Sequence, residues 1–480
     1  MSLEPRLFSL NLHNSYVKLN SIDDAEMFRC IDQIVEGLFN VCVTAGELPV
    51  IRARPGEAAA LIGERLDSKI RRHLKDRNNL FASSLDSLSY QRSVLILIDR
   101  NADLSIPFFH SWTYQALLHD ILDLESNRVS IVVDKDPEHK ESTDRIKRYY
   151  DLDVGLDEFW RENAGLPFPK VAENVDEQVK RYQEELNRIR RTDADALSED
   201  QLSSFTADLS DAIEKIPELQ RKKKCVDVHT NLASTLLKCL NERNIDAFFS
   251  VEEQMVANKF SPERSKVREL LDSKGTLEDK IRLFIIYFLT VKLSEEEVKE
   301  FTSALESKGA DLSFLNFLKR IHLSSSLAHS VSSAVSSASG IVEQKWSGAI
   351  GKGIDWLAGN VKNLLPIKTD LPVTCIVKDI MQNTPIPGDD SSFSSKYLYF
   401  DPKVPDDRSK DPPRIRTPFK QAIVCMIGGG NYVEYQNLQD FAARSKAPAT
   451  RSIIYGSTEI SNSSRMLMQL NELGAQVSLI

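Results

Sequence analysis

The sequence predicts an α/β fold in which one parallel sheet is assembled from two chain segments, with a large and mostly helical insertion between them. Three observations lead to this prediction. Short apolar runs rich in β-branched residues occur in two pairs, a helical pattern lies within each pair, and the pairs stand more than 300 residues apart. The chain has 480 residues, which is enough for two or three domains.

Four apolar runs are the expected strands, at 48–53, 93–100, 422–429 and 451–457. Their apolar character is continuous rather than alternating, which is typical of parallel strands that are covered on both faces. Helical patterns at 57–74 and 434–445 lie between the members of each pair. This order of strand, helix and strand predicts βαβ units.

The middle of the chain reads as helices. Apolar residues recur at helical spacing within 171–189, 202–216 and 228–240, and the segment 278–293 is apolar nearly all round, which predicts a buried helix. Pro217 falls between two of these patterns. Because a proline inside a helix costs about 3 kcal/mol, the pattern favours a helix boundary at this residue.

A serine-rich segment without formal charge, 323–342, precedes a stretch that places Trp346, Ile350, Ile354 and Leu357 at helical spacing. One interpretation is a flexible linker that leads into a core helix. The other is an amphipathic helix with a small uncharged polar face, a type of helix that detects packing defects in a lipid surface.

Composition argues against several classes of partner and site. The net charge of −9 argues against nucleic acid as the main partner, because phosphate binding needs a basic surface. The six cysteines form no CxxC pair and no Cys/His cluster with ligand spacing, so no zinc site is expected. No signal peptide is evident, and the best candidate for a membrane span, 283–291, is far shorter than the roughly 20 residues needed. The sequence predicts a soluble, cytosolic protein.

Three glycines raise the alternative of a nucleotide site. Gly428, Gly429 and Gly430 follow an apolar run and precede a helical pattern, as in many phosphate-binding loops. The dinucleotide fingerprint requires a further glycine where Val433 stands, and no P-loop sequence occurs. The other interpretation is a sharp turn off a buried strand, with Asn431 as the cap of the following helix.

The stretch 99–120 holds the densest group of polar residues. An enzyme would use His110 or His119 as a base, with an aspartate of the same stretch as its partner, but no serine lies in a G-x-S-x-G elbow. The alternative is structural, because carboxylates and Arg100 at the end of a strand can pair with one another and cap the next helix.

The same stretch carries the clearest resemblance to a known family. "LILIDRNADLSIPFFHSWTYQALLHDIL", which includes Trp112, resembles the signature of Sec/Munc-type (SM) proteins, the cytosolic partners of SNAREs, which drive membrane fusion. Further matches follow in family order, and these are "DEFW", "PFPKVAENV", "IPELQRKKKCVDVHTNLA", "EDKIRLFIIYF", "YLYFDPK" and "GGGNYVEYQNL". The last, with "HSWTYQALLHD", is most similar to the branch that acts between endoplasmic reticulum and Golgi (the Sly type).

The resemblance implies an arch-like fold without the family's first, amino-terminal domain. Residues 1–18 are expected to be a remnant of that domain. Residues 19–125 and 366–480 are expected to form the two segments of the second, α/β domain. Residues 126–365 would form the helical third domain, with a SNARE-binding hairpin and the loop 323–365. Without its first domain the chain could also be a decoy that occupies SNAREs unproductively.

The resemblance further implies a function without catalysis or cofactor. The chain would bind syntaxin-type and vesicle SNAREs and promote their assembly, as a monomer at the surface of endoplasmic reticulum and Golgi membranes. The contact residues expected on the hairpin are Pro217, Leu219, Val228, His229 and Leu232. Pro217 would be a switch between a folded-back and an extended hairpin. No partner side chain for His229 is evident in the sequence, so a role as metal ligand or catalyst is not expected. The loop 323–365 would meet vesicle lipid.

Overall fold

The computed structural model describes residues 2–4, 6–76, 79–81, 92–134, 145–194, 202–256, 262–329, 369–383, 396–404, 415, 417–444 and 450–477. These fall into two compact units. Unit 1 takes its described residues from Met1–Phe109, Val251–Lys345 and Ile367–Ile480, and unit 2 takes them from His110–Ser250. The predicted signature stretch is therefore divided between the units after Phe109.

Unit 1 contains a seven-stranded sheet with the order β1-β2-β9-β8-β4-β3-β7. The strands are β1 (Ser2–Glu4), β2 (Leu7–Ser9), β3 (Val50–Ala53), β4 (Val94–Asp99), β7 (Leu398–Phe400), β8 (Gln421–Ile427) and β9 (Ser452–Ser457). The four predicted strands are β3, β4, β8 and β9, and they pair in parallel. The prediction of a parallel sheet built from two distant segments is confirmed.

The junction between the two segments is the pairing of β4 with β8. Val94 lies opposite Ala422, and Asp99 lies opposite Ile427 at the carboxyl ends of both strands. This register places the residues after Asp99 beside the three glycines that follow β8. Two polar stretches far apart in the sequence therefore meet at one edge of the sheet.

Three short strands extend the sheet beyond the prediction. β2 pairs in parallel with β9, β7 pairs antiparallel with β3, and β1 pairs antiparallel with β2. Each has three residues, too few for a periodic pattern. Leu7–Ser9, within the segment expected to be a remnant of another domain, thus completes this sheet.

Helices cover the sheet where the sequence places them. α3 (Ala58–Leu74) connects β3 to β4, and α17 (Tyr432–Ala443) connects β8 to β9. α2 (Asp24–Ala45) packs on α3, and together they bury apolar side chains against alternate residues of the strands. Leu95, Leu97 and Ile423 are among the sheet residues of this core.

Unit 1 also includes helices from the predicted insertion. These are α10 (Arg264–Asp272), α11 (Leu277–Thr290), α12 (Glu295–Glu306) and α13 (Phe314–His329). Three further helices of this unit come from the sheet segments: α1 (Ser15–Asn20), α15 (Pro372–Gln382) and α18 (Ser463–Val477). α11 is buried continuously from Ile281 to Tyr287, as predicted. Within the described residues, no helix has the length and apolar character that crossing a bilayer requires.

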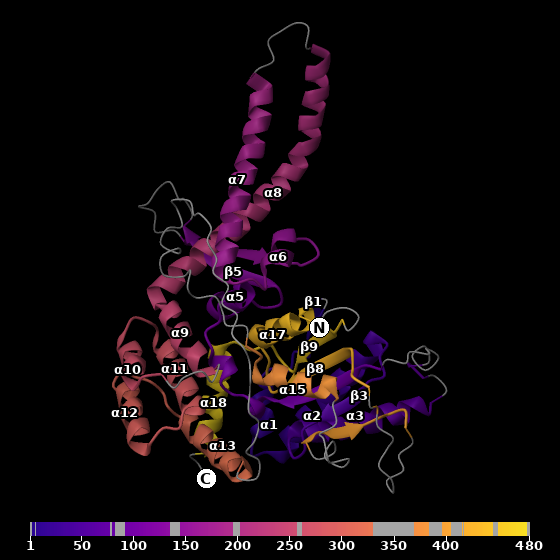
Figure 1. Ribbon diagram of the computed structural model, residues 1–480, viewed down its shortest axis with the longest axis vertical. Coiled ribbons are helices and arrows are strands. Elements are labelled where there is room, and N and C mark those ends of the chain that lie inside the picture. Colours follow the sequence, from indigo (N-terminus) through magenta and orange to yellow (C-terminus); the bar gives the residue numbers. More distant parts are fainter. Residues whose placement is uncertain are drawn as a thin grey trace. The chain divides into compact units, whose positions relative to one another are not determined.

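Unit 2 is built around a helical hairpin (Figure 1). Its elements are α5 (Tyr114–Leu122), β5 (Arg128–Asp134), β6 (Arg145–Asp151), α6 (Glu158–Asn163), α7 (Phe168–Ala194) and α8 (Leu202–Arg243), and α9 (Ile245–Val256) begins there. α7 and α8 lie side by side. The antiparallel ribbon β5–β6 was not predicted, because neither strand alternates apolar and polar residues regularly and the surrounding region reads mostly as helix.

The expected helix boundary at Pro217 is wrong. α8 continues through Pro217 as one helix of 42 residues. The pyrrolidine ring is exposed, so no side chain has to move to admit it. Three leucines further along α8, Leu232, Leu236 and Leu240, are buried. Their burial stabilises the helix against the local cost of the proline.

Candidate functional site

The three glycines form a tight turn at the carboxyl end of β8. Gly428 and Gly429 have φ angles of +97° and +105°, which side chains other than glycine rarely adopt. Their N–H groups both donate to Thr458 Oγ1 at 3.1 Å. The N–H of Gly430 donates to the carbonyl of Glu459 at 2.9 Å. The donors that would cradle a phosphate therefore bind groups of the protein itself.

The first turn of α17 contains the carboxylate of Glu434, at the helix end where a phosphate would bind in a nucleotide site. Asn431 accepts the N–H of Glu434 at 2.9 Å, which confirms the predicted cap. The Glu434 side chain is fully buried and pairs with Arg100 at 2.7 Å. Tyr455 donates its hydroxyl to the second oxygen of Glu434 at 2.6 Å. A phosphate at this helix N-terminus would meet the negative charge of Glu434, so the turn is a structural junction rather than a nucleotide site.

The polar residues after β4 complete the same junction. Asp99 accepts the N–H of Ala59 at the start of α3, and Asp103 accepts the N–H of Ser105 at 2.9 Å. Arg100 donates to the carbonyls of Asp103 and Gly429 as well as to Glu434. Burial, with the carboxylate of Glu57 beside it, raises the pKa of Asp99 to about 8. The structural interpretation is supported, but Arg100 pairs with the glycine motif and not with the carboxylates of its own stretch.

The other signature residues belong to unit 2. His110 is fully buried beside Phe248, with 5.5 Å between the ring centroids. Trp112 stacks on Phe249 at 5.3 Å. Asp99 and Asp103 lie in unit 1, and the other candidate base, His119, is buried on α5 in unit 2. His110 and Trp112 therefore anchor the start of α5 by packing.

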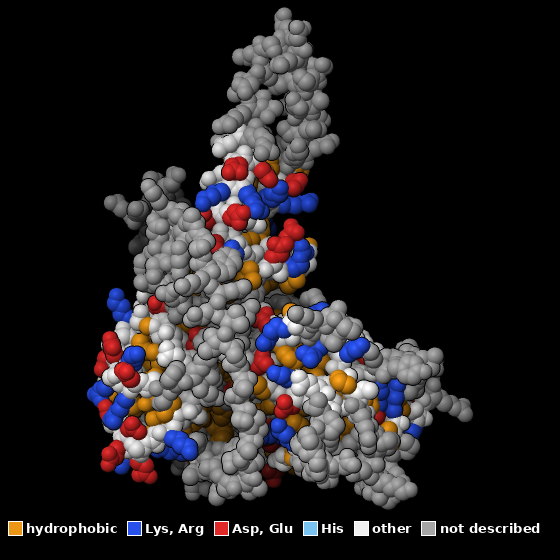
Figure 2. Space-filling model, viewed as in Figure 1, with side chains coloured by type: hydrophobic (Ala, Val, Ile, Leu, Met, Phe, Trp, Pro, Cys, Tyr) orange, Lys and Arg blue, Asp and Glu red, His pale blue; other side chains and the backbone are white. Residues whose placement is uncertain are grey.

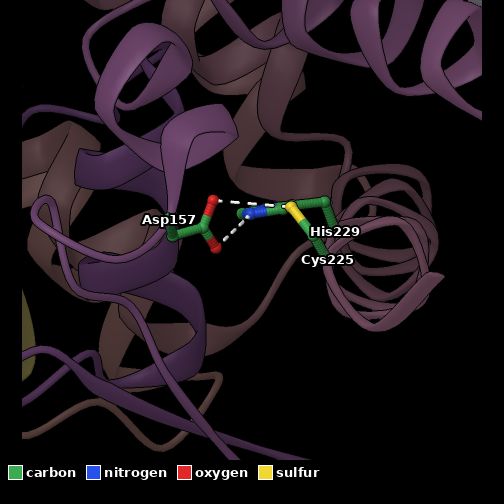
Figure 3. Close-up of side chains that lie close together, drawn as sticks. All are labelled: Asp157, Cys225 and His229. Atoms are coloured by element: carbon green, nitrogen blue, oxygen red, sulfur yellow. Dashed lines mark hydrogen bonds and ion pairs between the residues drawn. The ribbon is translucent and has the colours of Figure 1, made fainter. Parts of the chain in front are cut away.

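A second polar group connects α8 to the start of α6 through Asp157, Cys225 and His229 (Figure 3), and a contact with Tyr114 adds α5. The Asp157 carboxylate accepts the N–H of Trp160 at 2.9 Å and so caps α6. Its other oxygen lies 3.0 Å from His229 Nε2, and His229 Nδ1 lies 3.0 Å from the Tyr114 hydroxyl. His229 thus has a partner on each ring nitrogen, which corrects the expectation that it has none.

Cys225 completes a cluster whose ligand atoms lie within 4.8 Å of one another. Its thiol donates to Asp157 Oδ1 at 3.5 Å. Burial and the Asp157 carboxylate raise the pKa of Cys225 to about 12, so the thiol stays protonated at neutral pH. Burial opposes ionisation of Asp157, but hydrogen bonds from His229 and Trp160 outweigh it and lower the pKa of Asp157. Hydrogen bonds satisfy all three groups, and the cluster acts as a latch at the base of α8.

Removal of this latch is expected to destabilise unit 2. Asp157→Ala deletes a helix cap and leaves a buried nitrogen of His229 without an acceptor, at a cost of about 2–4 kcal/mol. Because the folded-state pKa of Asp157 is lowered, its contribution is complete above the ordinary aspartate pKa and is lost as the pH falls through the folded value. Urea unfolding followed by the fluorescence of Trp112 and Trp160 measures the loss.

The matched control for the latch is Glu158→Ala, which removes an exposed carboxylate from the next residue. We expect it to cost less than about 1 kcal/mol. An Asp157→Ala cost equal to that of Glu158→Ala, or one that is the same at pH 3 as at pH 7, would contradict the latch.

The expected contact residues of the hairpin differ in exposure. Pro217 is exposed, and Leu219 and Val228 are half-buried. His229 and Leu232 are buried and pack inside unit 2. The expected membrane residues, Trp346, Ile350, Ile354 and Leu357, lie outside the described residues.

Sequence reasoning missed four groups that the site depends on: Tyr114, Asp157, Glu434 and Tyr455. One signal was available, since Asn431 followed three residues later by Glu434 matches a capping pattern at a helix start. The others have no local signal, because their partners come from distant segments.

Comparison with known proteins identifies the family of this chain. The Sec1 family matches residues 1–469. The mouse protein named Sec1 family domain-containing protein 1 is 36% identical over 504 residues, which cover 99% of this chain and 76% of that protein. The protein sly1 of Schizosaccharomyces pombe is 35% identical, over 98% of this chain and 75% of its own length.

Two solved structures have a fold similar to that of this chain. A crystal structure of Sly1p in complex with an N-terminal peptide of Sed5p matches with a TM-score of 0.76 and 31% identity, covering 99% of this chain and 73% of that one. The SM protein Vps45 in complex with the Qa SNARE Tlg2 shares the fold, with a TM-score of 0.68 at 20% identity. The match over most of the chain, with the relatives at this identity, shows that the chain belongs to the Sec1 family.

Proposed function

We propose that this chain is a non-enzymatic SM protein that binds syntaxin-type and vesicle SNAREs and promotes their assembly during vesicle docking and fusion between endoplasmic reticulum and Golgi. It acts as a monomer on the cytoplasmic side of these membranes, without a cofactor. Membership of the Sec1 family supports this function, as does the similarity to Sly1p, whose structure was solved with a peptide of Sed5p.

The α7–α8 hairpin is the observation that carries the proposal. It presents two long helices side by side, with α8 continuous through Pro217 (Figure 1). A preformed helical surface can receive the apolar face of another helix. Hydrogen bonds from Cys225 and His229 to Asp157 fix the buried part of α8. The exposed part of the helix therefore extends from a rigid base.

Templating is the physical mechanism. SNARE segments that are disordered before assembly lose conformational entropy when they become helical. A rigid surface that binds two SNARE segments in register orders them before they contact each other. Part of the entropy loss is then offset by the energy of binding to that surface. Pro217, Leu219 and Val228 are the contact candidates that retain exposed surface, while His229 and Leu232 position α8 from inside unit 2.

The catalytic and nucleotide-binding alternatives make no use of the hairpin. The polar groups of the glycine turn after β8 and of the aspartate stretch after β4 form hydrogen bonds with other groups of the protein. These contacts support a function without catalysis. Residues 323–365 are proposed to contact vesicle lipid, on the basis of the uncharged serine-rich segment 323–342 and the apolar residues at helical spacing that follow it.

A binding assay tests the proposal. Purified full-length chain is titrated with cytosolic segments of endoplasmic reticulum–Golgi Qa and vesicle SNAREs, and separately with ATP, GTP and NAD, by isothermal calorimetry. We expect saturable binding of at least one SNARE and none of the nucleotides. Micromolar nucleotide binding that Gly429→Val abolishes, without SNARE binding, would overturn it.

A further inference from the structure

A basic run on α8 has more positive charge than its own helices neutralise. Arg221, Lys222, Lys223 and Lys224 are all exposed. Lys222 pairs with Glu185 of α7 at 3.2 Å and with Glu218 at 3.1 Å. Across the described part of the chain, the other three have no hydrogen bond or ion pair.

The acidic residues near this run do not neutralise its positive charge. Asp227 is exposed one turn further along and forms no ion pair with described residues. Asp151, which Lys224 influences, already pairs with Arg128 at 2.6 Å. Figure 2 shows Lys and Arg side chains at the surface of the described part of the hairpin.

The spacing of the run interleaves these cations with the exposed contact candidates. Pro217, Arg221, Lys224 and Val228 follow one another at intervals of four, three and four residues, which places them on one stripe of the helix. Lys223 lies one turn from Leu219 on the neighbouring flank. The apolar ends of the stripe are three helical turns apart, about 16 Å.

We propose that this stripe, defined by Pro217, Arg221, Lys224 and Val228, binds a SNARE helix that carries carboxylates beside its apolar layers. The inference rests on the proposed function and specifies the chemistry of the partner. The apolar positions at both ends match layers of a partner helix that lie three turns apart, and the two cations between them attract acids that flank the intervening layers. Charge complementarity of this kind sets register and speeds encounter.

The test uses two SNARE-motif peptides that differ only in having glutamate or glutamine beside the apolar layers. At about 0.05 M salt, where screening is weak, the full chain is expected to bind the glutamate peptide roughly tenfold more tightly. The double reversal Arg221→Glu/Lys224→Glu is expected to abolish that preference. The difference between the peptides is also expected to shrink as salt rises.

The matched control is the double reversal Lys180→Glu/Arg181→Glu on α7, which changes the net charge equally but removes cations that already pair with Asp176 and Glu177. It should leave the preference for glutamate intact.

Equal binding of both peptides by the unaltered chain overturns the charge inference while the proposed function stands. Failure of both peptides to bind overturns the proposed function as well. Binding to phosphatidylserine vesicles in place of either peptide, lost in the α8 reversal, would instead identify a membrane contact and overturn the partner named here.

Discussion

Glu434→Ala is expected to lower the free energy of unfolding of unit 1 by about 3–5 kcal/mol. Glu434 and Arg100 are both fully buried and pair at 2.7 Å. Removal of the carboxylate leaves the guanidinium charge without a counter-ion and the Tyr455 hydroxyl without its acceptor. Urea unfolding followed by circular dichroism measures the loss, and hydrogen exchange at the amides of α17 locates it.

Two controls separate this effect from the loss of any ion pair. Asp272→Ala removes an exposed partner of Lys308 in the same unit and is expected to cost less than about 1 kcal/mol. Arg100→Leu combined with Glu434→Leu removes both charges and is expected to cost less than Glu434→Ala alone. A Glu434→Ala cost as small as that of Asp272→Ala would show that the junction does not hold the two segments of the sheet together.

Pro217→Ala is expected to stabilise the continuous form of α8 and to tighten SNARE binding. The substitution restores a backbone N–H to the helix interior and removes the clash of the proline ring, a change of about 3 kcal/mol in helix stability. The continuous helix is the form proposed to bind, so affinity rises by the factor by which the folded-back form had reduced its population, which we expect to be no more than about tenfold. Circular dichroism and fluorescence anisotropy with a labelled SNARE segment measure the two effects.

Gln220→Ala is the control for Pro217→Ala, since it alters an exposed residue of the same helix without a proline. It should change neither helicity nor affinity by a comparable amount. Unchanged helicity together with unchanged binding in Pro217→Ala would contradict a switch at this residue.

The sheet could be predicted from sequence because its four central strands are buried on both faces. Burial makes each strand a continuous apolar run, and the run itself is the signal. The strands β1, β2 and β7 have three residues each and lie toward the edges of the sheet, so they leave no comparable pattern. Pro217 misled the prediction because its cost is local, whereas the burial of Leu232 and Leu236 that supports α8 lies further along the helix.

The polar junctions could be predicted only in part. Asn431 was predicted as a cap because its partner is local. Arg100 and Glu434 are 334 positions apart, and only the register of β4 with β8 brings them together. Asp157 and His229 are 72 positions apart and meet because α6 packs at the base of α8. Arg100 and His229 were candidates by residue type, but their partners Glu434 and Asp157 were missed, because only the topology brings these pairs together.

Assembly of SNAREs on the chain is tested most directly by lipid mixing between liposomes that carry a matched set of endoplasmic reticulum–Golgi SNAREs. Addition of the full chain is expected to accelerate lipid mixing, and Pro217→Ala is expected to accelerate it further. Lipid mixing that slows in proportion to added chain would contradict templating and would show that the chain occupies SNAREs unproductively.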